Sequence, residues 1–199
     1  LLIVLGEPNS IFSELIFKAY KRKIIQKFDR PIILIGSENL LKLQMKSLKY
    51  SIKIKKINSL NFKRLNLNKK NINILNVEFK FKKTFDKISN SSNKYINDCF
   101  NIAIKLLREK SAFGLINGPV SKKDFLEKKY LGITEYLAVK TKIKKKPTML
   151  IYNSSFSVCP ITTHVPINRV TKNLSKNKII NDVKNINHFY KKKLKKKPK

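Results

Sequence analysis

Short apolar runs alternate with amphipathic stretches along the chain, and this pattern predicts strands alternating with helices. Residues 1–5 form an apolar run typical of a buried strand, and residues 13–28 place apolar side chains at helical spacing. Residues 31–36 predict a second strand, and Ser37 is expected to cap the helix that continues through Leu48. This β-α-β order favours neighbouring parallel strands.

The middle of the chain continues the alternation. Residues 51–57 and 71–77 predict further strands, with a loop between them. Residues 89–93 can cap a helix with an apolar face, and residues 112–117 predict a strand that ends at a Gly-Pro turn. We therefore expect a three-layer α/β/α fold with a largely parallel sheet.

The last third of the chain is more polar. Ser121 and Asp124 have the spacing of a capping box and predict a short helix, and a further helix is expected after Thr134. Residues 148–152 and 156–162 predict two strands joined by a polar turn. The final helix is expected to present one apolar face, made of Ile179, Val183, Ile186 and Tyr190.

The chain of 199 residues carries a formal net charge of +33, with 40 lysines and only 5 arginines. Such a charge is typical of proteins that bind nucleic acid. The lysines are spread over the whole chain, however, and arginine is the residue favoured for bidentate phosphate and guanine contacts. We interpret most lysines as solvated surface, which disfavours nucleic acid as the main partner, and keep a basic nucleic-acid-binding protein as the alternative from another class.

The composition also bears on location. No apolar run approaches the roughly 20 residues that a membrane-spanning helix needs, so no membrane association is expected. Cys99 and Cys159 lie far apart in the sequence, without neighbouring cysteines, which suits a reducing compartment. We therefore expect a cytoplasmic protein.

Three strand-to-loop transitions carry the polar residues from which chemistry could be built: residues 6–14, residues 116–122 with their continuation at 132–138, and residues 160–167. Parallel sheets place their chemistry in loops beyond the carboxyl ends of the strands. Lys122 and the hydroxyl of Thr134 could contact a phosphate or carboxylate, and His164 directly follows a predicted strand. The positions of Cys99, Cys159 and His188 predict no zinc-binding cluster.

Four segments in register resemble the 4-hydroxythreonine-4-phosphate dehydrogenase family, which is related in fold to the isocitrate and isopropylmalate dehydrogenases. They are Gly-Glu-Pro through Glu-Leu at 6–15, Asn-Gly-Pro-Val-Ser-Lys at 117–122, Gly-Ile-Thr-Glu-Tyr-Leu-Ala at 132–138 and Thr-Thr-His-Val-Pro-Ile at 162–167. The resemblance implies oxidation of 4-phosphohydroxy-L-threonine by NAD or NADP in pyridoxal phosphate (vitamin B6) biosynthesis. The β-keto acid formed then loses carbon dioxide to give 3-amino-2-oxopropyl phosphate.

The resemblance also implies particular site residues. The family holds a divalent metal, such as zinc, magnesium or cobalt, with three histidines at the interface of a homodimer, and only the first maps onto this chain, as His164. The His-Thr pair that contacts the phosphorylated substrate in the family maps to Ile133 and Thr134. An isoleucine cannot donate or accept a hydrogen bond, so one substrate contact of the family is absent at Ile133.

The family continues well beyond the position that matches Lys199. We therefore expect residues 1–199 to be the amino-terminal portion of a two-domain α/β dehydrogenase, with the carboxyl-terminal portion missing and the fragment inactive alone. That portion would hold the other two histidines and most of the residues that bind the cofactor and the substrate phosphate. Two alternatives within the fold are a dehydrogenase of a related phosphorylated hydroxy acid, such as phosphothreonate, and an inactive paralogue.

Overall fold

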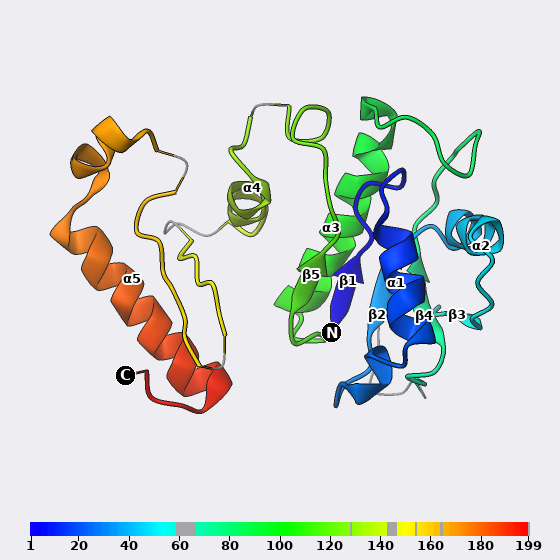
Figure 1. The fold of residues 1–199 in the computed structure, drawn as a ribbon, viewed down its shortest axis with the longest axis horizontal. Helices are drawn as coiled ribbons and strands as arrows, with labels where there is room; N and C mark the ends of the chain where they lie inside the picture. The colour runs from blue at the N-terminus through cyan, green and yellow to red at the C-terminus, as the bar shows by residue number, and fades with distance from the viewer. Residues whose placement is uncertain (59–66, 128, 143–146, 154, 164, 199) are drawn as a thin grey trace. The chain divides into compact units, whose positions relative to one another are not determined.

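The computed structural model describes residues 1–58, 67–127, 129–142, 147–153, 155–163 and 165–198 (Figure 1). They form two compact units, Leu1–Tyr136 and Leu137–Lys199. The first unit is built on a five-stranded, wholly parallel sheet in the order β3-β4-β2-β1-β5. The strands are β1 (Leu2–Val4), β2 (Ile33–Gly36), β3 (Ile54–Lys56), β4 (Ile72–Asn76) and β5 (Leu115–Asn117).

Helices cover both faces of this sheet. The helical elements are α1 (Phe12–Lys21), η1 (Ile25–Lys27), α2 (Glu38–Ser47), η3 (Asn90–Ser92) and α3 (Asn93–Arg108). Side chains alternate between the two faces of a strand. In β1, Ile3 belongs to a hydrophobic cluster with residues of α1 and α2, whereas its fully buried neighbours Leu2 and Val4 face the layer of α3. The expected three-layer α/β/α arrangement is confirmed.

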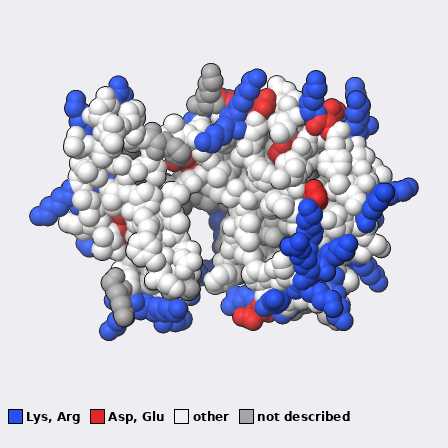
Figure 2. All heavy atoms as spheres, viewed as in Figure 1, with Lys and Arg blue, Asp and Glu red and all other residues white. Residues whose placement is uncertain are grey.

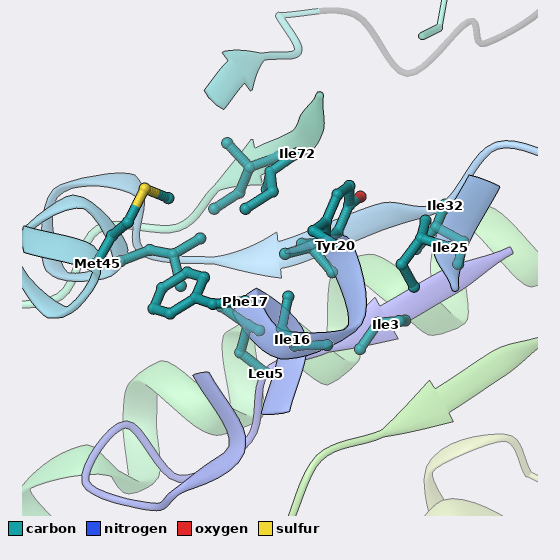
Figure 3. Close-up of a cluster of buried hydrophobic side chains, with 12 residues drawn as sticks. Ile3, Leu5, Ile16, Phe17, Tyr20, Ile25, Ile32, Met45 and Ile72 are labelled. Carbon is teal, nitrogen blue, oxygen red and sulfur yellow. The ribbon is translucent and has the colours of Figure 1, made fainter. Parts of the chain in front are cut away.

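The core beneath α1 shows why this sequence folds in this way. Phe17 and Tyr20 of α1 point toward Met45 of α2 and Ile72 of β4 (Figure 3). Phe17 is fully buried, and the burial of one such side chain stabilises a fold by about 1.5–3 kcal/mol. The helical spacing of the apolar residues therefore translates directly into a packed layer.

Several local predictions need correction. The helix expected over residues 13–28 ends at Lys21, because the chain turns through a positive φ of 56° at Lys23 before η1. The short helix expected after Ser121 is only a turn. The hydroxyl oxygen of Ser121 accepts a hydrogen bond from the amide of Asp124 at 3.0 Å, but no helix continues from it. By contrast, Ser37 caps α2 as expected, since its Oγ accepts a hydrogen bond from the amide of Leu40.

The second unit contains little buried surface. Helix α4 (Ile133–Lys140) crosses the boundary between the units, and η4 (Ile167–Arg169), η5 (Thr171–Asn173), α5 (Lys176–Phe189) and η6 (Tyr190–Leu194) follow. The two strands expected over residues 148–162 reduce to one antiparallel bridge between Ile151 and Val158. Among the described residues of 137–199, Asp182 alone is buried, and Val183 on the expected apolar face is 58% exposed.

The helices in the described ranges are too short or too polar to cross a lipid bilayer.

Candidate functional site at the carboxyl edge of the sheet

The loops that leave β1 and β5 are joined by backbone hydrogen bonds. The amide of Gly118 donates to the carbonyl of Val4 at 2.7 Å, and the amide of Glu7 donates to the carbonyl of Pro119 at 2.8 Å. The first and second of the polar transitions in the sequence therefore meet at one edge of the sheet. We call this pair of loops, residues 5–9 and 117–121, the clasp.

Two glycines make the clasp possible. Gly6 has a positive φ of 70°, and a Cβ placed on it would lie 2.4 Å from the carbonyl oxygen of Pro119. A Cβ on Gly118 would lie 2.3 Å from the carbonyl oxygen of Leu5. Because the obstacle in each case is backbone, no side-chain rotation relieves it, and the close approach of the loops requires glycine at both positions.

Glu7 ties the clasp to the start of α3. Its side chain is 3% exposed, and the hydroxyl of Ser92 donates to its Oε2 at 2.9 Å. The amide of Asn9 donates to its Oε1 at 3.1 Å. A buried carboxylate is tolerated only when its oxygens are satisfied in this way, so Glu7 fixes the position of the loop and is itself enclosed.

Residues 84–86, together with Gln44 of α2, hold the loop of residues 5–9 from another side. The side-chain amide of Gln44 donates to the carbonyls of Pro8, at 2.8 Å, and Thr84, at 3.3 Å, while the side-chain oxygen of Asn9 accepts from the amide of Asp86. The cavity that remains beneath, next to Glu7, measures only about 10 Å³. This volume is about that needed by one water molecule, so the cavity is too small to hold a phosphorylated amino acid.

The predicted substrate residues lie at the start of α4. Ile133 is half-buried and Thr134 is exposed in the first turn. The helix is anchored by Tyr136, whose hydroxyl donates to the side-chain oxygen of Asn97 of α3 at 2.9 Å. The Tyr136 ring also packs edge-on against the rings of Phe100, Phe125 and Tyr130, and burial raises its pKa. This aromatic anchor positions Thr134 relative to α3.

Of the remaining candidates, two are exposed, one is buried and one lies outside the described residues. His164, the predicted metal ligand, is outside them, and its role stays a prediction. Lys122 is exposed after β5, and His188 is exposed on α5. Cys99 is fully buried in α3, and burial raises the pKa of its thiol to about 12.

The described residues do not make a complete metal site. No group of three His, Cys, Asp or Glu side chains within them has the proximity needed to hold an ion. The whole chain contains two histidines, so a site built from three imidazoles requires donors from outside this chain.

Sequence reasoning missed the elements that support the site. Gln44 had no role assigned from the sequence, and Tyr136 was noted only within the family-like segment at 132–138, yet each makes a side-chain hydrogen bond to a different segment. Their signal was a polar group at a position that the helical pattern assigns to the buried face. Gly6 and Gly118, both directly after strands, gave a second signal, because a glycine there often marks close backbone approach.

Comparison with known proteins decides the family. A family model described as pyridoxal phosphate biosynthetic protein PdxA matches residues 27–199, most of the chain. The chain belongs to this family. A relative from Sulfurihydrogenibium sp. (strain YO3AOP1), named 4-hydroxythreonine-4-phosphate dehydrogenase, is 31% identical over 198 residues. That match covers 97% of the chain but 58% of the relative, so the chain spans little more than half the relative's length.

Solved structures of the same name share the fold. A 4-hydroxythreonine-4-phosphate dehydrogenase from Burkholderia phymatum superposes with a TM-score of 0.81 at 17% identity, covering 94% of this chain and 56% of that one. A putative enzyme of that name from Salmonella typhimurium gives 0.81 at 18% identity, covering 96% and 59%. The PdxA family membership confirms the resemblance found in the four sequence segments, and the structures confirm the fold.

Proposed function

We propose that this chain forms the amino-terminal portion of an NAD- or NADP-dependent 4-hydroxythreonine-4-phosphate dehydrogenase. The enzyme would oxidise 4-phosphohydroxy-L-threonine to a β-keto acid that loses carbon dioxide, giving 3-amino-2-oxopropyl phosphate. The match of residues 27–199 to the PdxA family carries this proposal. The name of the Sulfurihydrogenibium relative supports the choice of substrate.

The proposal gives roles to three residues. The Thr134 hydroxyl, exposed in the first turn of α4, would donate a hydrogen bond to the phosphorylated substrate near the free amides of the helix start. Ile133 would offer that substrate an apolar contact only. His164 would supply one imidazole to a zinc, magnesium or cobalt ion whose other two histidines come from outside this chain.

The proposal extends to domains and partners. Residues 1–199 would belong to the first portion of a two-domain enzyme that forms a homodimer in the cytoplasm, with its active site at the subunit interface. The exposed apolar residues of the second unit support the need for further polypeptide, since Ile151 is 57% and Phe156 is 75% exposed. Both cysteines are free, which suits a reducing compartment.

A chimera tests the activity. Residues 1–199 are joined to the part of the Sulfurihydrogenibium relative that has no counterpart in this chain, and formation of reduced nicotinamide is followed spectroscopically. Turnover should require 4-phosphohydroxythreonine, NAD or NADP and a divalent metal, and residues 1–199 alone should be inactive. A folded chimera without turnover, beside an active full-length relative, would contradict the proposal.

Ile133 favours a second candidate, the dehydrogenase of a related phosphorylated hydroxy acid. The half-buried isoleucine at the start of α4 cannot make a polar contact to the substrate, so it would discriminate less strongly between an amino group and the hydroxyl group that replaces it in phosphothreonate. The same chimera assayed with phosphothreonate separates the two candidates. A higher kcat/KM for phosphothreonate would replace the first assignment, and equal inactivity on both would favour an inactive paralogue.

A further inference from the structure

The sequence contains one Asn-Gly pair, Asn117-Gly118, and this pair lies in the clasp. In an unfolded chain, the deprotonated amide nitrogen of the residue after an asparagine can attack the side-chain carbonyl carbon of that asparagine. The new N–C bond closes a succinimide ring, and the side-chain nitrogen takes up a proton and leaves as ammonia. Water then opens the ring to aspartate or isoaspartate. Glycine favours the attack because it has no Cβ to hinder it.

The fold holds the attacking nitrogen away from this reaction. Asn117 is the last residue of β5 and pairs with Val4 of β1, so its backbone is extended. The amide of Gly118 donates its proton to the carbonyl of Val4 at 2.7 Å. Ring closure requires that this hydrogen bond breaks and that the peptide between residues 117 and 118 rotates out of the extended conformation. Both changes open the clasp.

Packing around Gly118 opposes the rotation as well. A Cβ built on Gly118 lies 2.3 Å from the carbonyl oxygen of Leu5 and 2.8 Å from the ring of Phe12, so that side of the main chain is filled. The side-chain amide of Asn117 donates to the carbonyl of Gly118 at 3.2 Å, which holds the group that would leave as ammonia. None of these contacts depends on whether Asn117 faces solvent.

The charge of the chain does not protect the pair. The attacking nitrogen is an anion, and nearby cations favour the charged form of an anionic group. Lys and Arg number 45 against 12 Asp and Glu, and Figure 2 shows basic side chains projecting at many places on the visible face. Slow deamidation of the folded chain would therefore result from its geometry and not from its electrostatics.

We propose that Asn117 is a deamidation site that the clasp keeps closed, so that its modification marks molecules in which the loops have opened. The mark is permanent, because isoaspartate adds one carbon atom to the main chain between residues 117 and 118. The Gly118 amide is then displaced from the carbonyl of Val4, and the clasp cannot close in its original form. This site is independent of the proposed dehydrogenase activity, since no predicted substrate or metal residue takes part.

Mass spectrometry of the tryptic peptide of residues 111–122 tests the proposal, because cleavage after Lys110 and Lys122 isolates the pair. The folded 199-residue chain and the free peptide are incubated in the same mildly alkaline buffer, and the fractions of aspartate and isoaspartate are followed with time. Asn117 should be modified at least about tenfold more slowly in the chain than in the peptide. Equal rates would overturn the proposal.

Hydrogen exchange of the Gly118 amide, followed by NMR in the same buffer, measures the opening independently. Exchange and deamidation both require the hydrogen bond to Val4 to break, but deamidation also requires rotation of the peptide. The factor by which folding slows deamidation should therefore equal or exceed the factor by which it slows exchange. Deamidation that is slowed less than exchange would contradict a route through the open clasp.

Gly6→Ala should open the clasp, because a Cβ there lies 2.4 Å from the carbonyl oxygen of Pro119. It should speed the modification of Asn117 by about tenfold while leaving the Asn-Gly pair unchanged. Phe17→Leu, in the core beneath α1, is the matched control, since it lowers the free energy of unfolding away from the loops.

The two variants are compared at equal free energy of unfolding, which a low concentration of guanidinium chloride adjusts. Faster modification in Gly6→Ala than in Phe17→Leu is expected. Equal acceleration would show that global unfolding limits the reaction and would overturn the role of the clasp. The rate and exchange measurements use the unaltered chain, so they decide the proposal even if Gly6→Ala fails to fold.

Discussion

The amide nitrogen of Gly118 lies 2.7 Å from the carbonyl oxygen of Val4, and this hydrogen bond continues the pairing of β1 and β5 one residue beyond the end of β5. The two loops that carry family-like sequence segments are thereby held together by their backbones. This contact fixes the backbone from which the side chains of both loops project. Substitutions in the clasp should therefore lower the free energy of unfolding.

Gly118→Ala should destabilise the protein by about 1–3 kcal/mol, because the added methyl group meets the backbone of Leu5 and forces the loops apart. Chemical unfolding followed by circular dichroism measures the change. Gly114→Ala is the matched control, since a Cβ there meets only a leucine side chain at 3.6 Å. It should be neutral or slightly stabilising. Equal losses in both variants would show that the clasp is not a special contact.

Glu7 and Ser92 should be coupled energetically. Glu7→Ala removes a charged acceptor from a buried hydroxyl and should cost about 1.5–3 kcal/mol, and Ser92→Ala should cost less. A double-mutant cycle on the free energy of unfolding should give a coupling of at least about 0.5 kcal/mol. Strict additivity would mean that the 2.9 Å contact between the two side chains contributes nothing to stability.

Tyr20 should make stability fall at high pH. Burial raises its pKa to about 12, whereas an unfolded tyrosine titrates near pH 10. Between these values the unfolded chain binds fewer protons than the folded one, so the free energy of unfolding decreases as pH rises, by up to roughly 2.7 kcal/mol. Below pH 10 this contribution is fully present.

Tyr20→Phe should remove that part of the pH dependence. The Tyr20 hydroxyl is buried without a hydrogen-bond partner in the described structure, so the variant should be as stable as the parent, or more stable, near neutral pH. Lysine titration is common to both proteins and cancels in the difference between their unfolding curves. Identical curves above pH 10 would refute the assignment to Tyr20.

The two cysteines should differ in reactivity. Cys99 is fully buried with its pKa raised to about 12, whereas Cys159 is partly exposed and its pKa is raised less, mainly by partial burial. Iodoacetamide at pH 8 should therefore modify Cys159 first, because the thiolate is the reactive form. Mass spectrometry of timed samples identifies the site, and Cys159→Ser leaves only the slow reaction. Equal rates would mean that α3 opens frequently.

Ile133→His should change the specificity of the chimera described above. The imidazole restores a hydrogen-bonding group at the start of α4, so we expect kcat/KM for 4-phosphohydroxythreonine to rise by roughly tenfold, which equals about 1.4 kcal/mol. Ile133→Leu is the control and should have no such effect. A rise in the leucine variant, or none in the histidine variant, would place substrate recognition elsewhere.

The sequence predicted the first unit well because its signals are local. The apolar run around Ile3 matches the buried positions, and Ser37 caps its helix. Of the residues expected at helical spacing after Ser13, Ile16 and Tyr20 are buried, whereas Leu15 and Ile24 are exposed. The end of α1 was wrong because nothing in the residue type of Lys23 signals a positive φ. Helix propensity alone therefore did not predict that α1 ends before Lys23.

The second unit and the site were less predictable for another reason. Residues such as Ile151 and Val183 lie in patterns typical of buried strands or helices but remain exposed. The pattern identifies an apolar face, but it does not show whether another element packs against that face. Likewise, the contact of Glu7 with Ser92 joins residues 85 positions apart. Only the topology of the sheet brings such pairs together.

Substitutions at the two glycines of the clasp and substitutions at the exposed positions around it should have different effects on the structure. The two hydrogen bonds that join its loops involve only main-chain atoms, so exposed side chains around the edge can change in charge and size without breaking them. An exchange at Gly6 or Gly118 meets a carbonyl group whatever the surrounding side chains are. Lysine can thus occupy much of the surface, while two achiral residues preserve the path of the chain.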